Sequence, residues 1–243
     1  RGEKMAAFAV TEPAAGSDAA AMETTAVRDG ASWVLNGTKH YITQGPVADY
    51  VIVFALTDRE KRQHGGISAF IVERGTPGFR IGNIQHFLGW RGVPQGELVF
   101  EDCRIPEENL LGPLGGGFRT VMRFLDEGRI GVAATCVGRA QRCLDLAIEH
   151  ARIRHTFGKR LADHQSVQNM IADSMTELHA ARLLVRDAAR KIDAGRRATT
   201  ECSMAKLYAT ETGFRVADRA IQIHGGMGLS KEMPLEMLYR DMR

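Results

Sequence analysis

The pattern of apolar and polar positions changes once along the chain and divides it into two halves. From residue 6 to about residue 112 the apolar runs are only three or four residues long, and turn residues separate them. Short apolar runs bounded by turn signals are typical of β-strands. We expect strands at five such runs, at residues 8–10, 33–35, 51–54, 69–72 and 98–100. Many short strands at this spacing favour an antiparallel β-sandwich or β-barrel.

Turn signals punctuate this first half. Asp29-Gly30 and Asn36-Gly37 each lie between strand-like runs. We expect a tight hairpin turn at both, because such dipeptides accept positive φ angles. Thr76-Pro77-Gly78 and Gly92-Val93-Pro94 mark two further turns, and the polar stretch 58–66 is expected to be a long exposed loop. Strands do not alternate with helices, so the pattern disfavours a doubly wound nucleotide-binding fold.

From Gly115 onward the apolar positions recur every three or four residues, which indicates helices. One apolar stripe runs from Val132 to Ala151 and a second from Val167 to Ile192. Gly195 suits the C-terminal end of the second helix, and another helical run covers residues 199–224. Helices with short connections are typical of a bundle. The sequence therefore predicts an α+β fold with two domains, a β domain over residues 1–113 and a helical bundle over residues 114–243.

Composition narrows the class of protein. The chain has 243 residues, 44% of them hydrophobic, which is enough to bury a core without disulfides or metals. The net charge of +3 does not by itself indicate a nucleic-acid partner. No run of 18 apolar residues is present, so no membrane-spanning helix is expected. The four cysteines form no CxxC pair and no zinc spacing, which favours a reducing compartment.

The two ends of the sequence suggest a piece of a longer protein. The chain begins at Arg1 without an initiator Met, a signal peptide or a transit peptide. It stops at Arg243 within polar, helical-looking sequence. We therefore expect both ends to be cuts, so any function that needs more chain lies outside this sequence.

Two junctions in the first half carry candidate chemistry. In Val10–Asp18, small residues follow a strand, and Gly16 and Ser17 offer N–H and hydroxyl donors to a phosphate. A plain small-residue turn explains the same segment, which contains neither a P-loop nor GxGxxG. Tyr41 and Thr43 suit stacking on a flat ring and hydrogen bonding to its edge. Alternating Tyr and Thr is also ordinary strand composition.

Two further junctions lie in the second half. Arg152–Arg160 either clamps an anion such as pyrophosphate or forms a solvated helix end whose cations complement the helix dipole. Gln222–Gly228 either lets backbone approach a cofactor or caps a helix and continues as a loop. His224 has no identifiable acidic partner, which favours a structural role. Asp126 and Arg129 share a helix face, and a surface ion pair explains them equally well.

Taken together, in their order and spacing, these segments resemble the acyl-CoA dehydrogenase family, and the resemblance covers almost the whole chain. The matching segments are Ala9–Asp18, then Leu35–Lys39 with Tyr41–Thr43, then Leu88–Arg91 with Leu98–Asp102 and Pro106–Gly112, then Arg154–Gly158 with His164-Gln165, and finally Gln222–Gly228. The resemblance implies a middle β domain followed by a C-terminal up-and-down four-helix bundle. The family's N-terminal helical domain is expected to precede Arg1.

The resemblance also implies a reaction and its binding residues. A carboxylate removes the α-proton of an acyl-CoA thioester while the β-hydrogen leaves as hydride to N5 of FAD. The trans-2-enoyl-CoA results, and the electrons pass to an electron-transfer flavoprotein. Residues that match the family's FAD contacts are Phe8, Val10, Thr11, Gly16, Ser17, Tyr41, Ile42, Thr43, Arg154, Thr156, Phe157, Gln165, Gln222, Gly225 and Gly226. Residues that match its acyl-CoA contacts are Ser17, Asp126 and Arg129.

The same resemblance implies an assembly and a location. The matching residues from Arg154 onward would reach FAD bound mainly to a neighbouring subunit, which implies a homodimer or homotetramer. The family is found in the bacterial cytoplasm or the mitochondrial matrix. No metal and no nucleic acid is expected. Residues 151–200 carry ten Lys/Arg against five Asp/Glu, a bias that fits phosphate binding by the cofactor and nucleic-acid binding equally well.

The catalytic base stays unassigned. The family places a Glu soon after the dipeptide matched by Arg240-Asp241, so we expect the base beyond Arg243. A minority of members place it at the position matched by Gly128, which cannot act as a base, and Glu127 is roughly 100° away around a helix. Two alternatives remain: an acyl-CoA oxidase-like flavoenzyme, and a non-catalytic flavin-binding relative that binds nucleic acid or assists assembly.

Overall fold

The protein is described by a computed structural model that covers residues 2–242. These residues form two compact units. We call residues 2–87 and 91–123 the β unit, and residues 88–90 and 124–242 the helical unit.

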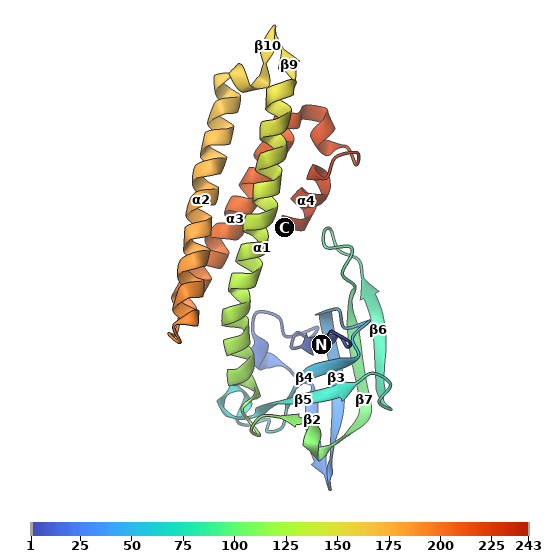
Figure 1. Ribbon diagram of the computed structural model, residues 1–243. Coiled ribbons are helices and arrows are strands. Elements are labelled where there is room, and N and C mark those ends of the chain that lie inside the picture. Colours follow the sequence, from blue (N-terminus) through green and yellow to red (C-terminus); the bar gives the residue numbers. More distant parts are fainter. Residues whose placement is uncertain (1, 243) are drawn as a thin grey trace. The chain divides into compact units, whose positions relative to one another are not determined.

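The β unit is built on one sheet whose strands follow the order β6-β7-β3-β2-β4-β5-β8, with β1 also paired to β4 (Figure 1). The strands are β1 (Ala6–Ala9), β2 (Thr25–Asp29), β3 (Ser32–Thr43), β4 (Tyr50–Leu56), β5 (Ile67–Glu73), β6 (Phe79–Gln85), β7 (Gln95–Pro106) and β8 (Leu110–Leu111). The β fold predicted for the first half of the chain is confirmed, with two differences. The sheet is mixed, because β1 and β2 pair with β4 in parallel. It also does not close into a barrel, because its path ends at β6 and β8.

One face of this sheet carries the apolar core. Along β3 the side chains alternate, with Trp33 and Leu35 buried and Val34 between them only half-buried. Trp33 packs against Phe70 with ring centroids 5.2 Å apart. Fully burying a side chain of this kind contributes roughly 1.5–3 kcal/mol of stability. The alternation of apolar residues along β3 therefore determines which face of the strand is buried.

The two predicted hairpin turns have different outcomes. Gly30 has φ +61° and makes the tight turn between β2 and β3, as predicted. The turn predicted at Asn36-Gly37 is wrong, because both residues lie within β3. Asn36 exchanges two hydrogen bonds with Asp102 on β7, of 3.1 Å and 2.8 Å, where the register of the two strands shifts. The dipeptide therefore lies at a β-bulge in the pairing of β3 with β7, two strands that are distant in sequence.

Gly37→Ala is expected to destabilise the β unit by about 1–3 kcal/mol. Gly37 has φ +146°, and a Cβ there would lie 2.5 Å from Oγ1 of Thr24. Gly30→Ala is the matched control, since Gly30 also has positive φ but a Cβ there meets no atom within 4 Å. Urea unfolding of both variants checks the difference. Equal losses would show that backbone strain alone, and not the contact with Thr24, sets the cost.

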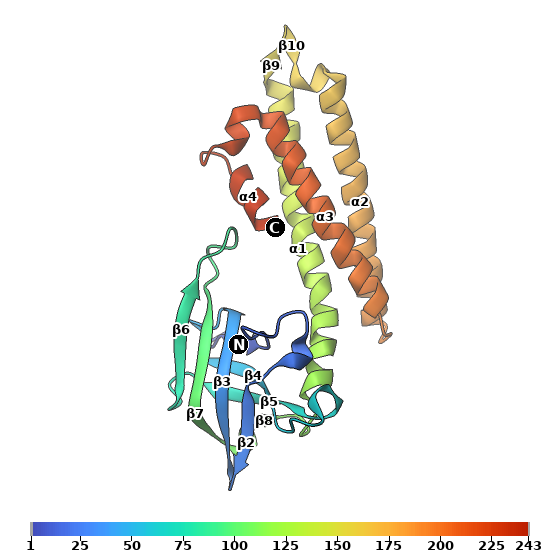
Figure 2. The same cartoon turned by 180° about the vertical axis from the view of Figure 1, so that it is seen from behind.

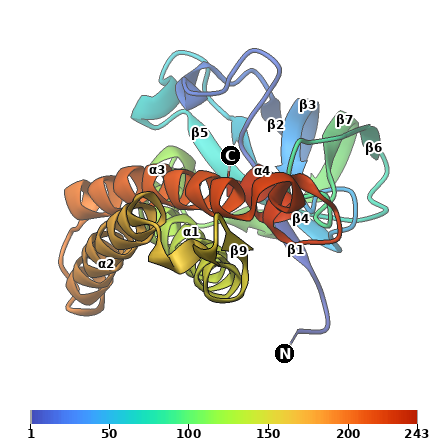
Figure 3. The same ribbon diagram turned by 90° about the horizontal axis from the view of Figure 1, so that it is seen from above.

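In the helical unit three long helices run side by side (Figures 1 and 2). The α-helices are α1 (Gly117–Ile153), α2 (Gln165–Asp193), α3 (Thr199–His224) and α4 (Leu235–Met242). Short 3-10 helices occur in both units. In the β unit they are η1 (Ala19–Ala21), η2 (Arg62–His64) and η3 (Glu107–Asn109), and in the helical unit they are η4 (Leu161–Asp163) and η5 (Gly225–Leu229). The short α4 lies beside α3 (Figure 3). The predicted helical bundle is confirmed, and its third predicted helix has the bounds of α3.

Small buried residues let these helices pack closely. Ala147 on α1, Ala181 on α2 and Ala205 on α3 are each almost fully buried in one apolar cluster. Side chains of this size permit short distances between helix axes. The apolar stripes predicted from the sequence therefore face one another across the core.

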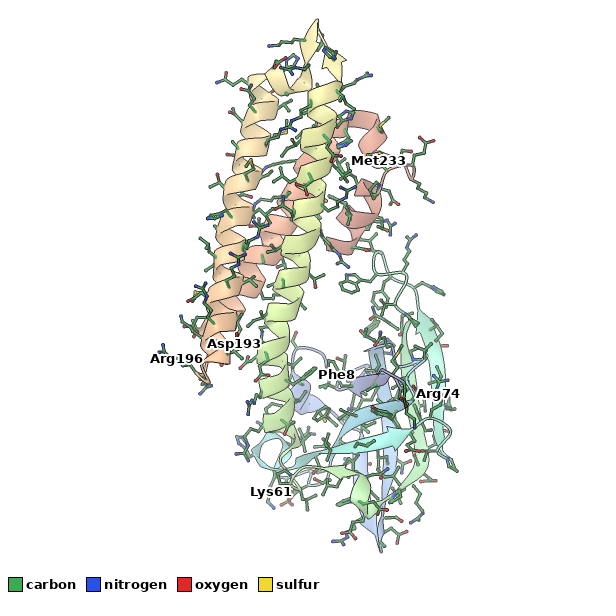
Figure 4. All side chains as sticks on the ribbon, in the orientation of Figure 1. Phe8, Lys61, Arg74, Asp193, Arg196 and Met233 are labelled. Carbon is green, nitrogen blue, oxygen red and sulfur yellow. The ribbon has the colours of Figure 1, made fainter. Side chains whose placement is uncertain are left out.

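The ends of α2 show how the helices are connected. Gly195, with φ +69°, follows the last turn of α2 as predicted. Asp193 and Arg196 mark that end in Figure 4, and a small hairpin lies at the opposite end of the helix. The hairpin consists of β9 (His155–Thr156) and β10 (Lys159–Arg160). One interpretation of Arg152–Arg160 is a solvated helix end. It is wrong for the residues after Ile153, because α1 ends there and the hairpin follows.

All four cysteines are buried and unpaired. Burial raises the pKa of Cys103 to about 11 and, despite a smaller opposing effect of Arg142, that of Cys143 to about 12. Cys136 and Cys143 pack in the helical core, as expected for small apolar residues.

Candidate functional site

In the β unit the structure places the first two candidate segments side by side. The amide of His40 donates a hydrogen bond of 2.8 Å to the carbonyl of Thr11. This bond sets residues 10–12 next to residues 39–41. Phe8, labelled in Figure 4, lies on β1 just before the first segment and is 39% exposed. The segment that contains Val10 and Thr11 is thus brought beside the segment that contains Tyr41.

A bulge in β3 turns Tyr41 outward. The pairing of β3 with β7 shifts register between Lys39 and Ile42, and Tyr41 has φ +57°. A bulge redirects a side chain and is common beside binding sites. Ile42 is buried, whereas Tyr41 is 53% exposed and its ring centroid lies 5.8 Å from that of Phe87. The result is an exposed aromatic surface, which suits a flat ring.

The segment that holds Gly16 and Ser17 is a loop with an open backbone. Both residues are exposed. A Cβ built on Gly16 meets no heavy atom within 4 Å. The loop therefore offers peptide groups and a hydroxyl that a phosphate or a ring edge can approach closely.

Beneath this loop, Glu12 and Lys39 form a buried ion pair. Nζ of Lys39 lies 2.7 Å from Oε1 of Glu12 and donates to the carbonyl of Val10 at 3.1 Å. Lys39 is fully buried and Glu12 is 6% exposed. Removing two charges from water costs several kcal/mol for each ion, and only good geometry and further hydrogen bonds offset that cost.

Both members of the pair are charged at neutral pH. Burial raises the pKa of Glu12, but the ammonium of Lys39 and several hydrogen bonds outweigh it and hold that pKa below its ordinary value of 4.5. Burial lowers the pKa of Lys39 to about 8, although the carboxylate opposes this change. A carboxylate whose pKa is depressed accepts protons weakly, so Glu12 is suited to holding structure rather than to proton transfer.

In the helical unit the structure brings two further candidate segments together. The rings of His150 and His224 stack with centroids 4.3 Å apart. This contact joins the end of α1 to the end of α3, so Arg154 and the hairpin lie near Gln222–Gly226. Arg154, Gln222, Gly225, Gly226 and Gln165 are exposed, Thr156 is half-buried, and Phe157 at the hairpin tip is 96% exposed.

The glycines at this end of the unit leave room for a ligand. Gly225 has φ +59° and ends α3. A Cβ at Gly225 or at Gly226 would meet no atom within 4 Å. His224 itself is buried, and its Nδ1 lies 2.8 Å from the carbonyl of Ala220. His224 therefore holds the end of the helix, and the open glycines are the ligand-accessible part.

Asp126 and Arg129 lie elsewhere in the helical unit. Arg154 is 28 positions after Asp126, which corresponds to roughly 40 Å along a helix. Asp126 pairs with Arg129 and accepts a hydrogen bond of 2.9 Å from Thr199 at the start of α3. The structure thus does not bring this pair together with the segments at the other end of the bundle.

A cluster that sequence reasoning missed surrounds Trp90 in the helical unit. The backbone N of Trp90 donates to Oδ1 of Asp241 at 2.7 Å, and its indole Nε1 donates to the Asp241 carbonyl at 3.0 Å. Arg139 donates to the same carbonyl, and its guanidinium lies 4.1 Å from the Trp90 ring centroid. The three residues line a pocket of about 200 Å³. Their separation of up to 151 residues leaves no local pattern that signals the cluster.

Across residues 2–242 there is no group of three or more His, Cys, Asp or Glu arranged to hold a metal ion. Over the same range no helix combines the length and apolar composition that crossing a bilayer requires.

Two family models match the chain. The model described as "Acyl-CoA dehydrogenase, middle domain" matches residues 7–103. The model described as "Acyl-CoA dehydrogenase, C-terminal domain" matches residues 115–243. Together they cover nearly the whole chain.

Individual proteins with known names are also similar. The chain is 47% identical over 242 residues to the caffeyl-CoA reductase-Etf complex subunit CarC of Acetobacterium woodii, covering 100% of this chain and 64% of that protein. It is 49% identical over 242 residues to the mitochondrial short-chain specific acyl-CoA dehydrogenase of Rattus norvegicus, covering 100% of this chain and 58% of that protein. Among solved structures, butyryl-CoA dehydrogenase from Megasphaera elsdenii matches with a TM-score of 0.96 at 44% identity, covering 98% of this chain and 62% of that one. The chain thus spans 58–64% of the length of these two curated relatives.

Proposed function

The chain belongs to the acyl-CoA dehydrogenase family, and we propose that its protein is an FAD-dependent acyl-CoA dehydrogenase. The proposed reaction is α,β-dehydrogenation of an acyl-CoA thioester to the trans-2-enoyl-CoA, with electrons passed to an electron-transfer flavoprotein. The observation that carries the proposal is the exposed Tyr41 on the β unit, whose neighbour His40 is hydrogen-bonded to Thr11 in the segment that leads into the open Gly16 loop.

The residues present fit a flavin dinucleotide. When bound, FAD supplies the hydride acceptor for the reaction. In the β unit, Phe8, Tyr41 and Thr43 would hold the flat ring, and Val10 and Thr11 would contact its edge through backbone and side chain. The open backbone at Gly16 and the hydroxyl of Ser17 fit phosphate or ring oxygens.

Other residues of this chain would bind acyl-CoA and exclude water. We assign Ser17, Asp126 and Arg129 to the acyl-CoA. The ion pair of Asp126 with Arg129 leaves the carboxylate engaged, so we give it a binding role and no proton-transfer role. Ile42 is buried in β3 next to Tyr41 and would help to exclude water from the flavin site.

The end of the helical unit that carries the β9–β10 hairpin would face a second subunit. Phe157 stands 96% exposed on a hairpin, beside the cationic Arg154 and the open glycines that follow α3. Together with Thr156, Gln165 and Gln222, these residues would reach FAD bound mainly to a neighbouring copy. We therefore propose a homodimer or homotetramer.

The names of the relatives support an electron carrier and a compartment. The Acetobacterium woodii relative is named as part of a reductase-Etf complex, which favours an electron-transfer flavoprotein as the partner. The rat relative is named as mitochondrial. We propose the mitochondrial matrix for a eukaryotic source and the cytoplasm for a bacterial one.

Arg154→Ala is expected to weaken FAD binding by about tenfold or more, because it removes a charge-assisted contact with the pyrophosphate, worth roughly 1.5–3 kcal/mol. Titration of the flavin-free full-length protein with FAD measures the change. Arg196→Ala is the matched control, since Arg196 lies at the other end of α2 and should leave the affinity unchanged. Equal affinity in the Arg154 variant would remove Arg154 from the site.

The proposed reaction is tested by mixing the full-length protein with acyl-CoA thioesters under anaerobic conditions. Bleaching of the flavin, followed by recovery when an electron-transfer flavoprotein is added, is the expected result. Recovery with oxygen alone would indicate an oxidase instead. A colourless protein, or one that binds a nicotinamide dinucleotide tightly, would contradict the proposal.

A further inference from the structure

The loop that carries Gly16 and Ser17 is closed at its base by one side chain. The carboxylate of Glu12 accepts hydrogen bonds from the amides of Glu23 at 2.6 Å and Thr24 at 3.0 Å. Glu12 stands at the start of the loop and Thr24 at its end. A single carboxylate therefore joins the two ends of the loop formed by residues 13–22.

The charge of that carboxylate is balanced from the neighbouring strand. Oε1 of Glu12 also accepts from Nζ of Lys39, which in turn donates to the carbonyl of Val10 just before the loop. Lys39 lies on β3, two positions before Tyr41. The loop and the aromatic surface are thus fixed to each other through one buried pair.

The other contacts of the loop do not replace this closure. The backbone groups of Glu12 and Ala15 exchange hydrogen bonds of 3.0 Å and 3.1 Å, which shape only the first turn. On the far side, Arg62 donates to the carbonyls of Ala20 and Met22 at 3.0 Å and 3.4 Å. These contacts hold the two limbs of the loop separately, whereas Glu12 ties one limb to the other.

We propose that Glu12, neutralised by Lys39, is a positioning residue that holds the loop of residues 13–22 in the shape that binds the flavin and the acyl-CoA. The inference rests on the proposed function for the identity of the ligand. Glu12 acts through the amides of Glu23 and Thr24 and does not itself touch the ligand.

Side-chain length separates this role from a general need for charge. Glu12→Asp keeps the negative charge opposite Lys39 but is one methylene shorter, so it cannot reach the ammonium and both amides together. Glu12→Gln keeps the length and removes the charge. Asp29→Asn is the matched control, because Asp29 is an exposed carboxylate of the same unit that pairs with Arg104 at 2.6 Å.

The test measures two properties of the full-length protein at a temperature where all variants are folded. Hydrogen exchange reports the amides of residues 13–24, and titration of the flavin-free protein reports the affinity for FAD. For Glu12→Asp we expect exchange about tenfold faster in residues 13–24 but unchanged in β3, β4 and β7. We also expect FAD binding about tenfold weaker and a shifted flavin absorption band. Glu12→Gln should change both properties in the same direction, and Asp29→Asn should change neither.

The outcomes distinguish this inference from the proposed function. If wild-type protein binds FAD and Glu12→Asp binds it equally tightly, the inference is wrong and the proposed function stands. If exchange rises throughout the sheet, Glu12 has only a general structural role and the inference is also wrong. If wild-type protein binds no FAD, the proposed function fails, and the exchange measurement still decides whether Glu12 closes the loop.

Discussion

Lys39→Met is expected to destabilise the β unit by about 3–5 kcal/mol, because it leaves the buried carboxylate of Glu12 without its cation. The apolar chain of Met fills much of the space of the Lys side chain, so the loss comes mainly from the unpaired charge. Urea unfolding at pH 7 measures it. At that pH wild-type Lys39 carries its charge, since its pKa is about 8.

A double variant separates charge from packing. Glu12→Gln together with Lys39→Met removes both charges and should recover a large part of the stability lost in Lys39→Met alone. Arg104→Met breaks an exposed ion pair with Asp29 and should cost less than about 1 kcal/mol. If Lys39→Met proves no more harmful than Arg104→Met, the buried pair does not stabilise the unit.

The second large effect concerns catalysis. Residues 1–243, prepared alone and loaded with FAD, are expected to keep their flavin absorption when mixed with acyl-CoA, because the base is expected beyond Arg243 and Gly128 stands at the alternative position. Glu12 is bound by Lys39, Glu97 by His40 and by the amide of Asn83, and Asp126 by Arg129. The pKa of Glu97 is lowered, chiefly by its hydrogen bond from Asn83, and that of Glu12 is lowered as well.

A longer form of the protein supplies the comparison. If a Glu follows Arg243, a chain that includes it should bleach, and changing that Glu to Gln should lower the rate by about 10²–10⁴-fold, the usual contribution of a general base. Rapid anaerobic bleaching by residues 1–243 would show instead that the base lies within them. Glu127→Gln would then be the first variant to make.

Local patterns predicted the elements whose causes are local. The bounds of α3 follow from apolar spacing and from the glycines after His224. The turn at Gly30 follows from the Asp29-Gly30 dipeptide, because glycine accepts the positive φ that the turn requires. At Asn36-Gly37 the same reasoning failed. There the conformation is set by Thr24 and Asp102, which the chain brings close only after folding.

The candidate site shows the same division. The sequence indicated Tyr41 and Gly16 because an aromatic residue and a small residue carry recognisable chemistry on their own. It did not show that Lys39 and Glu12, 27 residues apart, meet inside the unit. It also did not show the bulge that turns Tyr41 outward, since the bulge depends on pairing between β3 and β7. Contacts between distant segments therefore form the part of the site that sequence reasoning lacked.

Site-directed labelling of this chain needs no replacement of native cysteines, because all four thiols are buried and burial raises their pKa values. A cysteine introduced at the exposed turn after α2, as in Arg196→Cys, would be the rapidly reacting thiol of residues 2–242 and would accept a dye or a spin label there. The slow reaction rates of the native thiols then measure how often each unit opens. Modification of Cys103 reports opening of the β unit, and modification of Cys143 reports opening of the helical unit.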